Sequence, residues 1–175
     1  MSLNRLVLGV LLLGLSGQAH AATGWETFVS QYSGCSVEYP SYIFTPIQQT
    51  GADGATRFTS GLAEAAMVIA GGANEKQVSI ADIVRIYLEQ VEGESITYRR
   101  QEQGWAVYSG YRGGLIYYLK ATLSKDRQQA CVLELRYPVA NKLELDVIVS
   151  RISKSLRLPQ SGVAARELPD TDRDQ

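Results

Sequence analysis

The sequence predicts an α+β domain in which an antiparallel sheet of about six to eight strands is covered by two main helices. Short runs of alternating apolar and polar residues, separated by turns rich in glycine and proline, indicate strands joined by hairpins. Two longer segments, one in the middle of the chain and one near its end, repeat their apolar residues at helical spacing. This order of strands, helix, strands and helix places the helices on the faces of the sheet.

The first element of the domain is predicted to be a short helix. Thr23 and Glu26 form a capping-box pattern, which is typical of a helix N-terminus. Apolar side chains then follow at spacings that would put them on one helical face, and these are Trp25, Phe28, Val29 and Tyr32.

Eight segments carry the alternation expected of strands. Pro40 ends the first of them, because proline cannot donate to a ladder, and Asp53-Gly54 predicts a hairpin turn. Gly71 and Gly72 are expected to end the strand that precedes the central helix. The predicted strands are residues 35–39, 43–48, 56–60, 65–70, 96–101, 105–110, 115–123 and 130–137.

Two longer helices are predicted from apolar stripes and caps. The central helix covers residues 80–92, with Ser79 as its N-cap, Asp82 at the third position and Gly93 at its end. Asn141 and Glu144 form a second capping pattern, which predicts a helix that starts there and runs to about Leu156. Its expected inward side chains are Leu143, Val147, Ile148, Ile152 and Leu156.

The N-terminus has the pattern of a secretory signal peptide. Arg5 supplies a positive charge, residues 6–15 form an apolar run, and small residues precede a predicted cleavage site between Ala21 and Ala22. A membrane anchor is the alternative, but a spanning helix needs about 20 apolar residues. We therefore expect residues 1–21 to be removed on export.

Cleavage leaves a single globular domain of residues 22–158 and a flexible, charged tail of residues 159–175. The domain is expected in the periplasm or outside the cell, without a stable membrane span. The chain has one histidine, His20, which would leave with the signal peptide. This loss excludes histidine-dependent catalysis and histidine-ligated zinc. The sequence has no metal-loop or phosphate-loop motif, so neither a metal nor another cofactor is predicted.

The chain has two cysteines, Cys35 and Cys131. In an exported protein an even number of cysteines favours a disulfide, and both lie on the apolar faces of predicted strands. Such a bridge would close a loop of roughly 100 residues, which the chain-entropy relation values at about 4–5 kcal/mol. Two buried free thiols are the alternative.

Tyrosine is unusually frequent, with ten in the chain, and four fall in two adjacent strand segments. Aromatic side chains on a sheet offer large contact areas to sugars, peptides or proteins, which makes these four a candidate binding surface. Tyrosine also favours strands for packing alone, and that is the alternative. The four residues are Tyr108, Tyr111, Tyr117 and Tyr118.

Several features follow one another in a familiar order: Val37-Glu38-Tyr39-Pro40, Phe44, Arg57-Phe58 after the Asp-Gly turn, the central helix, the Trp105 strand, and Leu135-Arg136-Tyr137-Pro138 before the last helix. Through them residues 35–156 resemble a group of uncharacterised secreted bacterial proteins and, more distantly, the PsbP-like fold, an antiparallel sheet sandwiched by helices. The resemblance implies an accessory or assembly protein rather than an enzyme. The metal-binding histidines of some members have no counterpart here.

The preferred functional hypothesis is a non-enzymatic accessory protein whose partner is another envelope protein. A nucleic-acid partner is not expected, because the formal net charge is -1 and the charges are interspersed. A carboxylate-dependent hydrolase is one alternative, although the acids show no paired pattern, and Glu134 and Arg136 are expected as surface groups on the outer face of a strand. A binder of an apolar ligand between sheet and helix is the other.

Overall fold

The computed structural model of the protein describes residues 24–47, 54–61, 65–89 and 95–159. No helix in these ranges is long and apolar enough to cross a membrane. Several predicted features lie outside the described residues, namely the signal peptide with its cleavage site, Asp53 of the hairpin turn, Gly93 at the end of the central helix, and tail residues 160–175.

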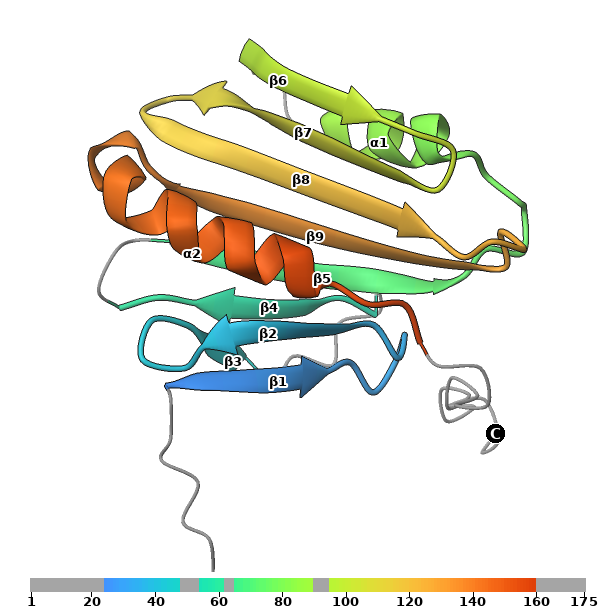
Figure 1. Ribbon diagram of the computed structural model, residues 1–175, viewed down its shortest axis with the longest axis horizontal. Helices are drawn as coiled ribbons and strands as arrows, with labels where there is room; N and C mark the ends of the chain where they lie inside the picture. The colour runs from blue at the N-terminus through green and yellow to red at the C-terminus, as the bar shows by residue number, and fades with distance from the viewer. Residues whose placement is uncertain (1–23, 48–53, 62–64, 90–94, 160–175) are drawn as a thin grey trace, which may run out of the picture.

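An antiparallel sheet of seven strands forms the centre of the domain (Figure 1). The last four strands of the chain form a meander, in which each strand pairs with the next. In spatial order the strands are β3 (Thr45–Ile47), β4 (Thr56–Thr59), β5 (Ala66–Ala73), β9 (Gln129–Pro138), β8 (Leu115–Leu123), β7 (Trp105–Arg112) and β6 (Ser95–Gln101).

Both faces of this sheet are partly covered. On one face, helix α2 (Lys142–Ser155), preceded by the short 3₁₀ turn η1 (Val139–Asn141), packs beside a small sheet made of β1 (Trp25–Val29) and β2 (Ser36–Pro40). On the other face, helix α1 (Ile80–Glu89) packs across β7 and β8. The α+β architecture predicted from the sequence is therefore confirmed, and the two faces are called the α2 face and the α1 face below.

Strand alternation divides the apolar side chains between the two faces. Leu133 and Leu135 of β9 belong to the core under α2, whereas Val132 of the same strand belongs to the core under α1. Along β8, Ile116 likewise packs in the α2 core, and Leu119 in the α1 core. The domain thus has a hydrophobic cluster on each side of one sheet.

The short helix predicted at the start of the domain is wrong, because residues 25–29 form strand β1. All five residues pair with β2, from Trp25 opposite Pro40 to Val29 opposite Ser36. A segment this short cannot sustain a helix on its own, since helix nucleation is costly. The ladder offered by β2 therefore determines its conformation.

The predicted strands are otherwise confirmed, with ends that shift by at most two residues except in β5. Strand β5 continues through Gly71 and Gly72, where the sequence predicts a break, and these residues pair with Cys131 and Ala130. A Cβ atom at Gly71 would meet the carbonyl oxygen of Ala130 on β9 and would lie 2.5 Å from the sulfur of Cys35. Glycine is present because β9 and the disulfide both approach the backbone closely, and not to end the strand.

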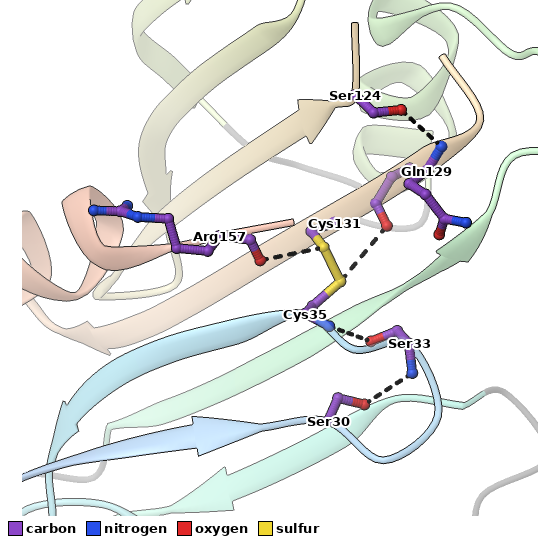
Figure 2. Close-up of a disulfide and its surroundings, with 8 residues drawn as sticks. Ser30, Ser33, Cys35, Ser124, Gln129, Cys131 and Arg157 are labelled. Carbon is purple, nitrogen blue, oxygen red and sulfur yellow. Dashed lines mark hydrogen bonds between the residues drawn. A yellow bond between two sulfur atoms is a disulfide. The ribbon is translucent and has the colours of Figure 1, made fainter. Parts of the chain in front are cut away.

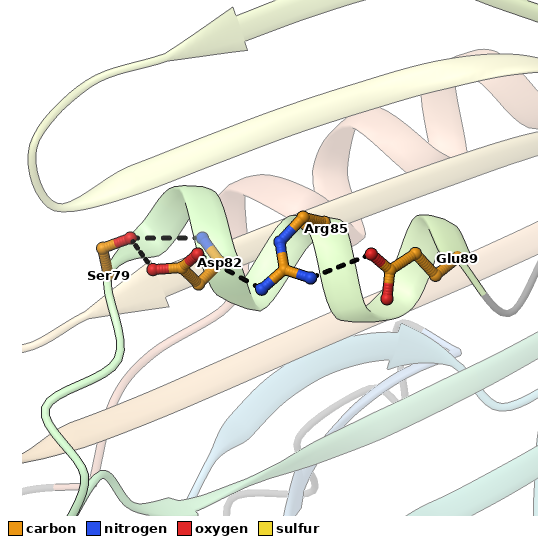
Figure 3. A network of polar contacts seen from close by, with 4 residues as sticks. All are labelled: Ser79, Asp82, Arg85 and Glu89. Carbon is orange, nitrogen blue, oxygen red and sulfur yellow. Dashed lines mark hydrogen bonds and ion pairs between the residues drawn. The ribbon is translucent and has the colours of Figure 1, made fainter.

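Helix α1 begins where the sequence predicts, with Ser79 as its cap. The backbone N–H of Asp82 donates to the Ser79 hydroxyl at 3.2 Å, and that hydroxyl donates to the Asp82 carboxylate at 2.6 Å. Arg85 then binds Asp82 at 3.4 Å and Glu89 at 2.8 Å (Figure 3). These charged groups line the outward side of α1, away from the sheet.

Helix α2 occupies the predicted residues but turns a different face to the core. Leu143 is 92% exposed and Val147 is 74% exposed, so their predicted inward positions are wrong. Asn141 makes no side-chain capping hydrogen bond, so the predicted cap is wrong as well. The buried side chains near or in α2 repeat at spacings of four, three and four residues, and they are Leu145, Val149, Ile152 and Leu156.

Candidate interaction surfaces

The disulfide predicted between Cys35 and Cys131 joins the small sheet to the large one (Figure 2). The two Cα atoms are 5.9 Å apart, and both residues are fully buried. Each sulfur lies 3.6 Å from a backbone carbonyl oxygen, that of Ala130 for Cys35 and that of Arg157 for Cys131. The pairing is confirmed, and the alternative of two free thiols is excluded.

The structure does not bring the four predicted tyrosines together on one surface. Tyr108 and Tyr117 lie on the α1 face, where they line a small recess beside α1. Tyr111 and Tyr118 lie on the α2 face, and the Tyr118 hydroxyl is 2.6 Å from the Ser153 hydroxyl of α2. The four tyrosines do lie on the adjacent strands β7 and β8, but alternation along each strand points one tyrosine of each strand to each face of the sheet.

A groove of about 340 Å³ opens on the α2 face between α2 and the outer strands β6 and β7. We call it the tyrosine groove, because its walls include a third and a fourth tyrosine besides Tyr111 and Tyr118. Tyr98 is 52% exposed and Tyr111 is 39% exposed at its rim, whereas Tyr137 is buried. Other groups that line it are Ile116, Lys142, Asp146, Val149 and Ser150.

Helix α2 supplies the polar wall of the tyrosine groove. Lys142 pairs with Asp146, and the Tyr137 hydroxyl donates to the same carboxylate at 2.7 Å. Burial alone would raise the pKa of Asp146, but these two hydrogen bonds outweigh it and lower that pKa below its ordinary value. Burial, together with this contact, raises the pKa of Tyr137. At neutral pH the wall therefore holds a paired carboxylate and a neutral phenol.

A stripe of exposed apolar residues runs along the outward side of α2. Val139, Leu143 and Val147 are four residues apart in sequence, and they are 41%, 92% and 74% exposed. We call these three residues the α2 stripe. The sequence predicts Leu143 and Val147 as core residues, but α2 carries two apolar stripes, and the packed one contains Leu145, Val149 and Ile152.

The α1 face carries a second groove, of about 540 Å³, over β4, β5 and β9. Its floor is made of small side chains, including Ala66, Val68 and Ala70, so we call it the alanine groove. Ile86 and Tyr87 of α1 form one wall, and Arg57, Glu134 and Arg136 supply the charged groups.

Glu134 is half-buried and not the surface group that the sequence predicts, whereas Arg136 is exposed. Burial raises the pKa of the Glu134 carboxyl, and the charges of Arg136 and Arg57 offset this only in part. Alternation along β9 indicated the correct face for Glu134, but the sequence had no signal that α1 would cover it. No group of three His, Cys, Asp or Glu side chains that could hold a metal occurs within the described ranges.

No protein-family model matches the chain, and no curated protein matches its sequence. The structure is similar to the cyanobacterial PsbP protein CyanoP from Synechocystis sp. PCC 6803, with a TM-score of 0.57 and 13% identity over 83% of this chain and 98% of that one. It is also similar to the Ran-binding protein Mog1p of Saccharomyces cerevisiae, with a TM-score of 0.56 and 4% identity over 77% of this chain and 95% of that one. At such low identity the likeness concerns the fold alone, and it confirms that the chain has a PsbP-like fold.

Proposed function

We propose that this protein is a non-enzymatic accessory protein that works outside the cytoplasm and binds another envelope protein. The partner would contact the α2 stripe together with the tyrosine groove beside it. The observation that carries the proposal is the exposure of Leu143 and Val147 on a helix whose opposite side is fully packed.

The α2 stripe has the chemistry of a protein-binding surface. Soluble domains rarely expose neighbouring large aliphatic side chains unless a partner covers them, and aromatic residues such as Tyr98 and Tyr111 are enriched at the centres of interfaces. Charged residues of α2, including Glu144, Arg151 and Lys154, surround the stripe and would form a polar rim. An apolar centre with a charged rim supports a specific protein contact.

Binding is better supported than hydrolysis at this surface. Asp146 is the one carboxylate among the residues that line the tyrosine groove, and Lys142 and Tyr137 already occupy it. Hydrolysis of a glycoside needs two carboxylates across the substrate. A structural neighbour, Mog1p, is described as a Ran-binding protein, which supports a PsbP-like fold as a scaffold for protein contacts.

A location outside the cytoplasm is supported by the disulfide and by the predicted signal peptide. Disulfides persist in oxidising compartments and are rare where thiols are kept reduced. A bridge between two fully buried cysteines, on separate sheets, fits a protein that folds after export. The sequence pattern of residues 1–21 predicts the same route.

The proposal is tested by partner capture with matched variants. The mature protein, a Leu143→Ser/Val147→Ser variant and a Val29→Ser control are immobilised and exposed to an envelope extract of the source organism. Val29 is a suitable control because it is 54% exposed on β1, remote from the α2 stripe. We expect the wild type and the control to retain the same protein, and the double variant to retain at least about tenfold less, since apolar anchors carry most of an interface's affinity.

Circular dichroism and thermal unfolding verify that the double variant is folded, because its changed side chains are exposed. Two results would contradict the proposal. One is retention of the same protein by the double variant at the wild-type level, and the other is a wild type that retains nothing above a blank surface.

A further inference from the structure

A small recess lies beneath the C-terminal half of α1, on the face opposite the α2 stripe. Four tyrosines line it, Tyr87 from α1, Tyr108 from β7, and Tyr117 and Tyr118 from β8, and Glu134 lies at its floor. The Tyr118 side chain itself points to the α2 face. We call it the aromatic recess. Its volume of about 20 Å³ holds one water-sized group, because a site for one water needs at least about 10–15 Å³ by the same measure.

Glu134 is the polar group in the aromatic recess that lacks a donor. Within the described part of the chain, no side chain or backbone N–H donates a hydrogen bond to its carboxylate, and no cation lies within ion-pair distance. A half-buried carboxylate without a donor costs free energy, and burial raises its pKa accordingly. A bound group that donates hydrogen bonds would remove this cost.

The walls of the recess suit a small cation. The faces of tyrosine rings attract cations, and in this recess the rings accompany a carboxylate. The Tyr108 ring already makes a cation–π contact within the protein, since the Arg99 guanidinium lies 5.7 Å from its centroid. The Tyr108 hydroxyl donates to Gln101 at 3.1 Å, which fixes the ring in place. An ammonium group satisfies both the size and the charge of the recess.

The aromatic recess continues into the alanine groove, because Tyr87 and Glu134 line both. Arg136 lies two residues from Glu134 on β9 and on the same face of the sheet, so the Cα atoms of the two residues are roughly 7 Å apart. Ala66 lies opposite Arg136, and Val68 lies opposite Glu134. The floor beside the acidic and basic groups, on β5, is therefore made of small apolar side chains.

We propose that the aromatic recess and the alanine groove form one binding site for a short peptide with a free amino terminus. The ammonium group enters the recess and donates to Glu134 among the tyrosine rings. The carboxylate binds Arg136, and small side chains lie on the alanine floor. This site is independent of the proposed partner surface, because it occupies the opposite face of the sheet.

The test is a titration of the full mature chain, labelled with ¹⁵N, with dialanine, N-acetyl-dialanine and dialanine amide. We expect dialanine to shift the amide resonances of Tyr108, Tyr117 and Glu134 in a saturable way. Acetylation removes the ammonium and adds bulk, so N-acetyl-dialanine should bind at least about tenfold more weakly. Dialanine amide keeps the ammonium and should lose only the contribution of Arg136.

Two variants assign the contacts, and two more serve as controls. Glu134→Gln is expected to weaken dialanine binding at least about tenfold, whereas Glu102→Gln, an exposed acid at the end of β6, leaves it unchanged. Arg136→Gln should weaken the binding of dialanine but not that of dialanine amide. Leu143→Ser/Val147→Ser should bind dialanine like the wild type, which keeps this test separate from that of the proposed function.

The proposal would be overturned by any of three results. The first is the absence of saturable shifts up to about 10 mM dialanine, a concentration beyond the weak end of specific binding. The second is equal binding of N-acetyl-dialanine, which would remove the ammonium from the site. The third is unchanged binding by Glu134→Gln, whose fold is verified from its own amide spectrum.

Discussion

Gly71 is a residue of the large sheet that leaves no room for a side chain beside the disulfide. We predict that Gly71→Ala destabilises the protein by about 1–3 kcal/mol, the range for overpacked core positions. The added methyl group would meet the sulfur of Cys35, at 2.5 Å, and the carbonyl oxygen of Ala130, and neither belongs to a flexible side-chain end. Urea unfolding followed by circular dichroism measures the loss.

Gly72→Ala is the matched control for this substitution. Gly72 has a similar backbone angle, φ +149° against +157°, but no atom lies within 4 Å of the position of its Cβ. The control therefore includes the backbone strain without the steric contact, and its loss should be clearly smaller. Equal losses for the two variants would contradict the role assigned to the steric contacts of Gly71 with Ala130 and Cys35.

At the scale of single residues, alternation in the sequence predicted which side chains point inward on β2 and β9, including Cys35 and Cys131. It could not predict why Gly71 is a glycine, because the atoms that require it belong to Cys35, just before β2, and to Ala130 on β9, both far from Gly71 in the sequence. Glu134 shows the same limit. Its face was predictable from its neighbours on β9, but its burial depends on α1, which lies far from it in the sequence.

At the scale of elements, the two helices differ in how they begin. We predict that Ser79→Ala costs about 1 kcal/mol, because the Ser79 hydroxyl accepts from the Asp82 N–H and its loss leaves that donor without a partner. Asn141→Ala should cost less than about 0.5 kcal/mol, because the Asn141 side chain caps nothing in α2. Urea unfolding of both variants measures the difference. A larger loss for Asn141→Ala would be inconsistent with the capping described here.

The elements also show where local pattern is sufficient and where it fails. Helix α1 was predictable because its N-cap and its single apolar stripe both indicate the same helix, starting after Ser79. Residues 25–29 were not, because the segment is short and its conformation depends on pairing with β2. In α2 the position of the helix was predictable but its orientation was not, since both Leu143 and Leu145 begin an apolar stripe and only the packed structure distinguishes them.

At the scale of the whole molecule, the disulfide is a covalent cross-link, additional to the main chain, between the small sheet and the large one. It joins residues that are 96 positions apart, for which the chain-entropy relation gives about 4–5 kcal/mol. We predict that Cys35→Ala/Cys131→Ala lowers the free energy of unfolding by an amount near this value while the fold is kept. Urea unfolding of the oxidised wild type, the reduced wild type and the variant measures it.

Reduction should bring the wild type close to the double variant, because both lack the covalent loop. If the oxidised wild type and the double variant unfolded at the same urea concentration, the bridge would contribute nothing to stability. A variant that failed to fold would instead show that the small sheet needs the bridge to stay attached, and reduced wild type would then unfold too.

The overall architecture was predictable because β6 to β9 form hairpins between consecutive segments, whose signals are local. The pairing of β5 with β9 brings together residues more than 55 positions apart, and the sequence patterns of the two strands do not reveal it. The division of the four tyrosines between two faces follows instead from alternation along β7 and β8. The candidate surfaces could therefore be identified only from the structure, even though most of the helices and strands that form them were predictable from the sequence.

The position of the bridge also determines how the domain would respond to mechanical load. When the two ends of the chain are pulled, the covalent path for the force runs from Cys35 through the disulfide to Cys131. Strands β2 to β8 and helix α1 lie in the loop that the disulfide closes, so the pulling force does not extend them. Only β1, most of β9 and α2 can be pulled out. If the protein is held at one end and pulled at the other, α2 would detach from the sheet with the α2 stripe long before the central strands are extended.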